Sequence, residues 1–276
     1  MSDPCPPPAD STDSGSDSGV DETLSGLIDL AAADPEVVGL VLSGSRVHSG
    51  MVTDRSDHDV HVILRDDHGP RPQGALSARR SARLDLLVMT LGEFRRRALP
   101  GDAYAWLRYA YVHARVVYDG LDGGIARVLD AKRVRRPGEA RALVADHLDA
   151  YINQVHRSLK SFRDGRDVLG HLDAAESVGP ALEVLFALHE RVRPYNKYLV
   201  WEVERAPLGP PQWAARRLLR TVRQILADGD PATQRALFGD IERAARAAGH
   251  GPVLDAWGSD LELLRPVEGR GAGPDR

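Results

Sequence analysis

Residues 40–64, LVLSGSRVHSGMVTDRSDHDVHVIL, decide the fold of the first part of this chain. An apolar run over 37–42 stops at Ser43-Gly44-Ser45, which predicts a buried strand that ends in a tight turn. Alternating apolar residues over 60–63 predict a second strand soon after it. A Gly-Ser turn at the end of a strand exposes backbone N–H groups and a hydroxyl, which are good partners for phosphate oxygens.

Three aspartates stand at special positions around these strands. Asp57 and Asp59 open the second strand, and a spacing of two places both carboxylates on one face of it. Their mutual repulsion is most simply relieved by a divalent cation with hard oxygen ligands. Asp85 interrupts the apolar stretch Leu84-Asp85-Leu86-Leu87-Val88, where an ionised carboxylate is costly unless it is paired or coordinated.

An Asp-x-Asp pair alone carries little information. The chain has 28 aspartates, for which chance predicts roughly three such pairs. A second pair, Asp228-Gly-Asp230, precedes Pro231 and is typical of a turn and a helix start. The informative feature is the conjunction of a strand ending in Gly-Ser, an Asp pair opening the next strand, and a lone Asp within a third.

This conjunction resembles the nucleotidyltransferase superfamily of the DNA-polymerase-β type, and in particular its bacterial aminoglycoside and lincosamide branch with the minimal nucleotidyltransferases. The family pattern is an apolar strand, Gly-Ser, about ten variable residues, Asp-x-Asp and an acid on a later strand. The residues that match it are Gly44 and Ser45, Asp57 and Asp59, Asp85, and, in the style of the bacterial branch, Gly50 and Ser56. The match covers roughly residues 36–118.

The resemblance implies Mg²⁺-dependent transfer of a nucleoside monophosphate to an acceptor hydroxyl, with pyrophosphate leaving. Asp57 and Asp59 would hold Mg²⁺ against the triphosphate, and Gly44 and Ser45 would hold the terminal phosphates. Asp85 would share a second metal or accept the proton of the acceptor. Family habit favours ATP as the donor, and the acceptor would be a small hydroxylated molecule such as an aminoglycoside, or a protein side chain.

Plainer roles exist for several of these residues. Asp85 could pair with an arginine such as Arg83 or Arg46. Arg46 could contact phosphate or lie on a solvated surface. His58 alternates with the acids and is expected to be packed or hydrogen-bonded rather than a ligand.

The remaining pattern predicts an α+β protein in two parts. Helices are expected at 21–33, 91–99, 102–110 and 122–132, and further strands at 84–89 and 112–118. These complete a nucleotidyltransferase domain, a mixed sheet flanked by helices, over 21–132. Residues 139–264 carry helical spacing at 139–163, 171–192, 211–227 and 232–248 and predict a helical bundle. The segment 133–138 is the expected linker, and 1–20 and 265–276 are expected to be a disordered leader and tail.

Two residues of the helical half are further candidates. Lysine is rare, with three residues against 33 arginines, so Lys197 is a candidate nucleotide contact, although a capped helix start with packed tyrosines explains it equally well. Glu176 is a candidate acceptor-binding acid, because some antibiotic-modifying relatives take such an acid from their helical domain. A solvated helix acid is the plainer interpretation.

Composition excludes several classes of protein. The 276 residues are 42% apolar and 28% charged, and no apolar run approaches the roughly 18 residues of a membrane span. Residues 1–22 hold six acids and no Lys or Arg, which leaves 36 basic and 34 acidic residues elsewhere and gives no support to general nucleic-acid binding. Cys5 is the single cysteine, so no internal disulfide exists. Without a signal-peptide pattern, we expect a cytoplasmic protein.

A rival interpretation keeps the fold but changes the substrate. In systems that resemble this one, a minimal nucleotidyltransferase acts as an antitoxin that modifies a partner protein, a helical ribonuclease marked by Arg, four to six residues, and His. Arg141 and His147 have that spacing, but a chain this rich in arginine gives nearly four such matches by chance. A non-catalytic binding module is disfavoured by the intact acids, and a homodimer is compatible with the sequence.

Overall fold

The computed structural model describes residues 18–67, 76–209 and 211–266 of the chain. The chain divides into two compact units, Met1–Ala131 and Lys132–Arg276. Nearly all of the predicted leader and tail lie outside the described residues. The first unit mixes strands and helices and the second is helical, so the predicted α+β class is confirmed.

The first unit is built on a five-stranded mixed sheet with the strand order β3-β4-β2-β1-β5. Strand β1 pairs antiparallel with β2 and β5, whereas β2 and β4 are parallel and β3 is antiparallel to β4. The strands are β1 (Val37–Ser43), β2 (His58–Leu64), β3 (Arg79–Arg80), β4 (Leu84–Thr90) and β5 (Arg115–Asp119).

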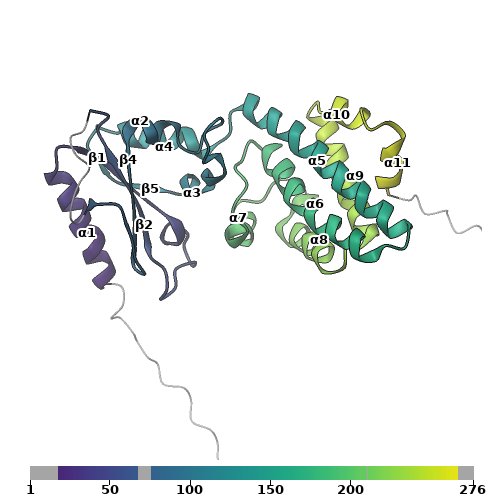
Figure 1. The fold of residues 1–276 in the computed structure, drawn as a ribbon, viewed down its shortest axis with the longest axis horizontal. Helices are drawn as coiled ribbons and strands as arrows, with labels where there is room; N and C mark the ends of the chain where they lie inside the picture. The colour runs from purple at the N-terminus through teal and green to yellow at the C-terminus, as the bar shows by residue number, and fades with distance from the viewer. Residues whose placement is uncertain (1–17, 68–75, 210, 267–276) are drawn as a thin grey trace, which may run out of the picture. The chain divides into compact units, whose positions relative to one another are not determined.

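Helices cover both faces of this sheet (Figure 1). Leu27 and Ala31 of α1 pack with Leu40 and Leu42 on one face, while Phe94 of α2 packs on the other, in a cluster to which α3 and α4 also contribute. All seven residues of β1 are buried for this reason. The helical segments are α1 (Ser18–Ala33), η1 (Gly44–Val47), α2 (Leu91–Arg96), η3 (Ala105–Leu107), α3 (Tyr109–Val112) and α4 (Gly124–Arg133).

Several boundaries of the first unit differ from the prediction. Helix α1 begins three residues earlier, at Ser18 rather than at 21. Helix α2 ends at Arg96 because Arg97 leaves the helical conformation and Ala98 has a φ of 64°. The helix expected at 102–110 is split into η3 and α3, and the last strand begins at Arg115 rather than at 112. The two-residue strand β3 was not predicted.

The second unit contains helices and 3₁₀ turns, and its described residues form an isolated bridge between Val134 and Arg191. Its core is formed mainly by α5 and α6 with α8 and α9 packed against them. The segments are α5 (Pro137–Arg163), α6 (Asp167–Ala187), η4 (Asn196–Tyr198), α7 (Leu199–Arg205), η5 (Pro211–Trp213), α8 (Ala215–Asp228), α9 (Pro231–Ala247), α10 (Gly251–Asp255), η6 (Gly258–Asp260) and α11 (Leu261–Leu264).

The predicted linker and some helix ends of the second half also need correction. Helix α4 runs on to Arg133 and α5 begins at Pro137, so the connection is shorter than 133–138. Helix α6 spans Asp167–Ala187 rather than 171–192, because the chain turns after it, with Glu190 at a φ of 55°. As predicted, Asp230 caps a helix, accepting a hydrogen bond from the Thr233 N–H.

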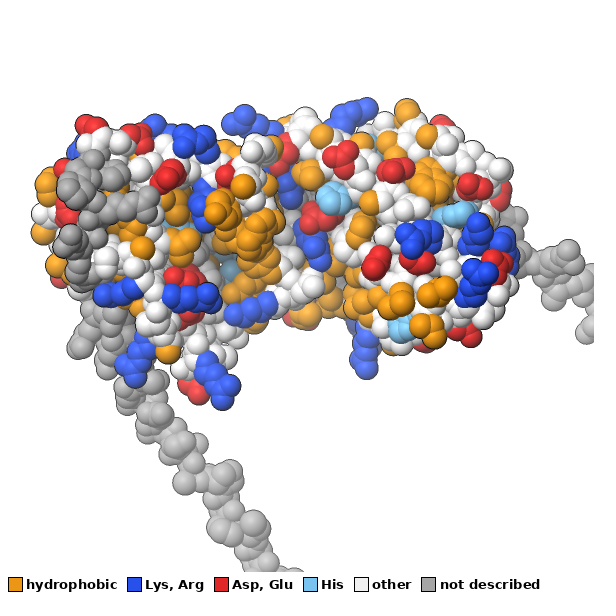
Figure 2. Space-filling view, in the orientation of Figure 1, with side chains coloured by type: hydrophobic (Ala, Val, Ile, Leu, Met, Phe, Trp, Pro, Cys, Tyr) orange, Lys and Arg blue, Asp and Glu red, His pale blue; other side chains and the backbone are white. Residues whose placement is uncertain are grey.

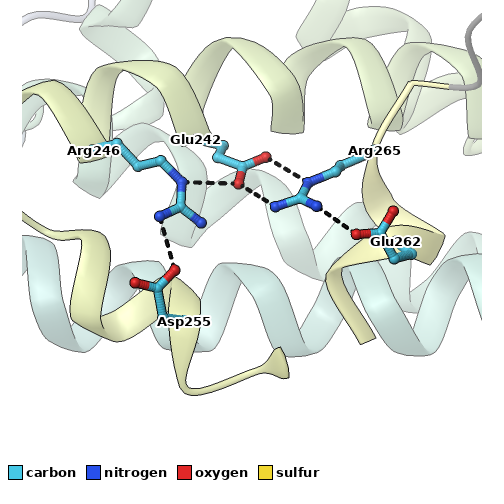
Figure 3. Close-up of polar contacts among 5 residues, drawn as sticks. All are labelled: Glu242, Arg246, Asp255, Glu262 and Arg265. Carbon is cyan, nitrogen blue, oxygen red and sulfur yellow. Dashed lines mark hydrogen bonds and ion pairs between the residues drawn. The ribbon is translucent and has the colours of Figure 1, made fainter. Parts of the chain in front are cut away.

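Charged side chains of both signs lie interspersed over the face shown in Figure 2. In the second unit some of them form a connected network (Figure 3), in which Glu242 of α9 accepts hydrogen bonds from Arg246 and Arg265. Arg246 also contacts Asp255 of α10 at 2.8 Å, and Arg265 contacts Glu262 at 2.5 Å. The network therefore ties the last short helices to α9.

Candidate active site

The Gly-Ser turn directly follows β1. Gly44 has a φ of 73°, in the left-handed region that favours glycine. A Cβ atom at this position would lie 1.8 Å from Oδ2 of Asp59. Glycine is therefore required twice, for the backbone conformation and for the close approach of a carboxylate. The turn continues as η1, in which Ser45 is buried.

Three polar residues form a row across neighbouring strands at this end of the sheet. Ser43 of β1 pairs with Asp59 of β2, which in turn pairs with Asp85 of β4. Register partners on neighbouring strands, about 4.8 Å apart, point to the same face. Asp57 stands immediately before β2. The structure thus brings Gly44, Asp59 and Asp85 together, with Asp57 two residues from Asp59.

Arg46 supports the loop that carries Asp57. Its Nε donates to the Asp57 carbonyl at 3.1 Å and its Nη2 donates to the Ser56 carbonyl at 2.8 Å. The loop begins just after η1, so these two bonds tie both of its ends together. Arg46 thus holds the backbone of the loop next to Asp57 in place. A phosphate contact from Arg46 stays a prediction.

Asp85 has a weak ionic neighbour. Its Oδ2 lies 3.9 Å from Nε of Arg80, whose side chain is 86% exposed, whereas that of Asp85 is 21% exposed. Arg80 occupies the register position opposite Asp85 in β3. The sequence pointed to Arg83 or Arg46 as partners. An exposed ion pair of this length contributes about 0–1 kcal/mol, so it does not explain the position of Asp85 by itself.

Two histidines contact residues of the turn, His48 through a backbone carbonyl and His61 through a side-chain hydroxyl. Nδ1 of His48 lies 2.7 Å from the Gly44 carbonyl oxygen, and because a carbonyl only accepts, Nδ1 carries the proton. Nε2 of His48 then faces the Tyr109 hydroxyl at 3.4 Å. On β2, Nε2 of His61 lies 3.2 Å from the Ser43 hydroxyl.

The His48 bond fixes the orientation of one peptide group. The Gly44 carbonyl and the Ser45 N–H belong to the same peptide unit, and in a trans peptide they point in opposite directions. With the carbonyl turned toward His48, the Ser45 N–H is turned away from the His48–Tyr109 pair. Sequence reasoning gave no structural role to His48, His61 or the Ser43 hydroxyl, because a single histidine or serine in a variable loop or a strand gives no periodic signal. His58 is buried, in agreement with its predicted packed role.

The donor atoms at this end of the sheet suit a hard divalent cation. The carboxylates of Asp57, Asp59 and Asp85 offer oxygen ligands, which Mg²⁺ prefers. Within the described ranges, no three His, Cys, Asp or Glu side chains are arranged to hold a metal ion. Mg²⁺ in nucleotide sites is usually held by one or two carboxylates together with substrate phosphates. A cation that arrives with a nucleotide would need only one or two of these carboxylates.

The two candidates from the helical half lie in the second unit. Lys197 in η4 is exposed, and its Nζ lies 5.2 Å from the centre of the Tyr198 ring. Glu176 on α6 accepts a hydrogen bond from Gln154 at 3.1 Å and lines a hollow of about 340 Å³ that Arg157 and Lys160 also line. Their roles as nucleotide and acceptor contacts stay predictions.

Comparisons with solved structures find eleven chains that match this one in structure. A crystal structure of a nucleotidyltransferase-like protein from Exiguobacterium sibiricum matches 89% of this chain and 78% of its own, at 16% identity and a TM-score of 0.44. No protein-family model matches the chain. No curated protein matches it in sequence. Within the described residues, no helix is both long and apolar enough to cross a membrane.

Proposed function

We propose that the chain is a Mg²⁺-dependent nucleotidyltransferase that moves a nucleoside monophosphate, AMP from ATP, to a hydroxyl of a small molecule such as an aminoglycoside-like antibiotic. The observation that carries the proposal is the fit between Gly44 and Asp59. Only a residue without a Cβ leaves room for the Asp59 carboxylate against the turn, and Asp85 stands in register beside it. This is the pattern that the sequence resemblance implies.

Each part of the site has a role in this reaction. The Ser45 N–H, oriented by the His48 bond to Gly44, binds the terminal phosphates together with the Ser45 hydroxyl. Asp57 and Asp59 would hold Mg²⁺, which would neutralise triphosphate charge and orient the α-phosphorus for in-line attack. Arg46 keeps the Asp57 backbone in place through its two carbonyl contacts.

In the transfer step, one bond to the α-phosphorus forms and another breaks. The acceptor oxygen forms a bond to the α-phosphorus, the bond from that phosphorus to the bridging oxygen breaks, and pyrophosphate leaves. The acceptor proton passes to Asp85 if this residue is the base. If Asp85 is instead a ligand of a second cation, the proton passes to solvent. The position of Asp85 beside Asp59 is compatible with both roles.

The first experiment measures transfer directly. The protein is incubated with α-labelled ATP, GTP, CTP or UTP, Mg²⁺ and a panel of hydroxylated acceptors that includes aminoglycosides. Label on a small molecule supports the proposal, and label on protein supports the rival antitoxin-like activity. Asp59→Asn and Asp57→Asn should abolish Mg²⁺-dependent nucleotide binding while the melting temperature stays near that of the wild type. Wild-type affinity for Mg-ATP in both variants would show that the metal site is assigned wrongly.

The rival ribonuclease motif gains no support from the helical unit. Arg141 and His147 both lie on α5, six residues apart, which places them about 120° apart around the helix axis. Arg141 donates to the Gly249 carbonyl at 3.4 Å. The two side chains therefore do not lie on one face of α5.

A further inference from the structure

The first turns of α6 expose apolar side chains to solvent. Val168, Leu169 and Leu172 are 74%, 50% and 60% exposed, while Gly170 and Ala174 lie on the buried face of the same helix. Single exposed apolar side chains are ordinary, but a group of them marks an interaction surface. A helix that is apolar on its outer face as well as on its inner face is typical of one that is covered on both sides.

Helices α5 and α6 lie antiparallel, and contacts along their length fix their register. These contacts join Ser158 to the Gly170 carbonyl (2.7 Å), Arg157 to Asp173 (3.2 Å) and Gln154 to Glu176 (3.1 Å). Residue numbers rise on one helix as they fall on the other. The register therefore places Lys160 about level with Gly170, on the side of Leu172 that is away from Glu176.

A hollow of about 340 Å³ between these helices is lined by charged residues of both signs. Arg157 and Asp173 pair with each other within the chain. Lys160 and Glu176 are exposed, and neither makes an ion pair with another residue that the structure describes. The face thus keeps one cation and one acid for a contact outside the chain. This balance does not favour a partner of a single charge, but it favours a surface that complements itself.

A two-fold axis that crosses α6 at right angles near Leu172 makes this face complementary to itself. In such a contact, residue i of one copy meets residue j of the other, and j meets i. The two copies of α6 then run antiparallel across each other. Because Lys160 and Glu176 lie on opposite sides of Leu172 along the helix pair, Glu176 of one copy comes to the level that Lys160 occupies in the other.

We propose that the first turns of α6 and the end of α5 form the contact of a symmetric dimer of this chain. Leu172 meets its own copy at the centre, Val168 and Leu169 extend the apolar part, and two pairs of Lys160 with Glu176 lie at the ends. An apolar centre with a polar rim is the usual arrangement of a protein interface. The contact lies within the second unit, does not depend on nucleotide transfer, and gives Glu176 a role other than the predicted acceptor contact.

Sedimentation velocity of the full chain without nucleotide tests the contact, so that the proposed activity and the dimer can fail separately. The wild type should convert reversibly from monomer to dimer within a range of about 5–500 µM, which covers weak to moderate affinities. Leu172→Glu should raise the dissociation constant by about tenfold or more, because it places two carboxylates against each other at the axis. Leu30→Glu, at a 46% exposed position of α1, is the matched control and should leave it unchanged. A wild type that stays monomeric, or a dimer that tolerates Leu172→Glu, would overturn the proposal.

An exchange of charges tests the geometry of the contact. Lys160→Glu and Glu176→Lys should each weaken the dimer by about fivefold or more at low salt, since two pairs of like charge then meet. An equimolar mixture of the two variants should associate as well as the wild type, because both pairs again have opposite signs. Melting temperatures near that of the wild type would show that the variants are folded. A mixture that associates no better than its components would contradict the proposed pairing.

Chemical crosslinking locates the axis. Cys5→Ser removes the single cysteine of the chain and provides the background for new ones. In this background, Leu172→Cys should be crosslinked into a dimer by a short bismaleimide, since the side chain lies beside its own copy. Leu30→Cys is the control and should stay monomeric. Equal crosslinking of the two variants would show that the axis does not pass near Leu172, and the proposal would be wrong.

Discussion

Gly44 shows how a single residue can determine the candidate site. Its φ of 73° and the absence of a Cβ let the Asp59 carboxylate lie against the turn, and its carbonyl receives the His48 Nδ1–H. The conformation of this residue, the position of the acid and the direction of the Ser45 N–H are therefore linked. Substitutions around Gly44 can separate these effects.

Substitutions of His48 separate the direction of the Ser45 N–H from the conformation of Gly44. Asparagine places an N–H donor where His48 has Nδ1, whereas glutamine places one nearer to the Nε2 position. We expect His48→Asn to keep nearly wild-type affinity for Mg-ATP and His48→Gln to lose about fivefold, since a net hydrogen bond contributes about 1 kcal/mol. Calorimetric titration measures the affinity, and amide exchange at Ser45 reports the turn without nucleotide. Equal affinities and equal exchange rates in the two variants would contradict a positioning role.

Asp85 is tested by a change that keeps its volume. Asp85→Asn still forms hydrogen bonds but cannot take a proton. If Asp85 is the base, turnover should fall by roughly 10² to 10⁴, while affinity for Mg-ATP barely changes. If it is a ligand of a second cation, the affinity or the metal dependence of turnover should shift as well.

The Arg80 contact provides the control for this variant. Because Arg80 is 86% exposed, losing the ion pair should leave the melting temperature nearly unchanged. Arg80→Gln should therefore resemble the wild type in melting and in turnover. Unchanged turnover in Asp85→Asn would remove Asp85 from the site and leave Gly44, Ser45, Asp57 and Asp59.

Among the helices of the second unit, α9 carries Glu242, whose carboxylate accepts hydrogen bonds from Arg246 and Arg265. Burial alone would raise the pKa of Glu242, but hydrogen bonds from Arg265 and Arg246 outweigh it and hold that pKa below its ordinary value. A lowered pKa in the folded state stabilises the fold at pH values above the unfolded pKa. This contribution is lost as the pH falls through the folded pKa.

Glu242→Gln should therefore cost about 1–2 kcal/mol of unfolding free energy at neutral pH. The difference from the wild type should shrink in acid, as Glu242 itself becomes protonated. Urea unfolding at a series of pH values measures both effects. Glu262→Gln is the matched control, since Glu262 contacts the same arginine but is 71% exposed. A pH-independent difference between Glu242→Gln and the wild type would show that packing rather than charge is responsible.

The elements also show what sequence patterns can and cannot reveal. Apolar runs and alternation located the strands β1, β2 and β4, because a sheet buried on both faces demands apolar residues. Strand β3 is Arg79-Arg80, both exposed, so it exists only through its pairing with β4 and has no hydrophobic signal. Helix α2 ends where Ala98 adopts a positive φ. An alanine in the sequence gives no sign of this conformation, because positive φ values are typical of glycine.

At the scale of the whole molecule, the candidate site could be predicted only in part. The sequence indicated Gly44, Ser45 and the three acids because they stand at the ends or within three successive apolar strands, in a pattern that resembles a known family. It did not indicate the contact of His48 with Gly44 or those of Arg46 with Ser56 and Asp57, because these contacts depend on how a loop folds back on η1.

The charge of the whole chain yields a last prediction. Residues 1–17 carry four acids and no Lys or Arg, so a chain that starts at Ser18, where α1 begins, changes its net charge from -4 to 0. Removing negative charge should strengthen binding of the anionic triphosphate at low salt, by about twofold to threefold. The gain should vanish near 0.15 M salt, where the Debye length is about 8 Å.

A full-length variant with Asn at positions 3, 10, 13 and 17 separates charge from chain length. If the effect is electrostatic, this variant and the truncated chain should have the same salt dependence of Mg-ATP affinity and nearly wild-type melting. The truncation should cost no stability, because residues 1–17 hold little that is apolar to bury. Weaker nucleotide binding or a lower melting temperature in the truncated chain alone would show that the segment contributes contacts to the folded protein. The start at Ser18 makes this outcome interpretable, because a start at Asp21 would also remove the first turn of α1.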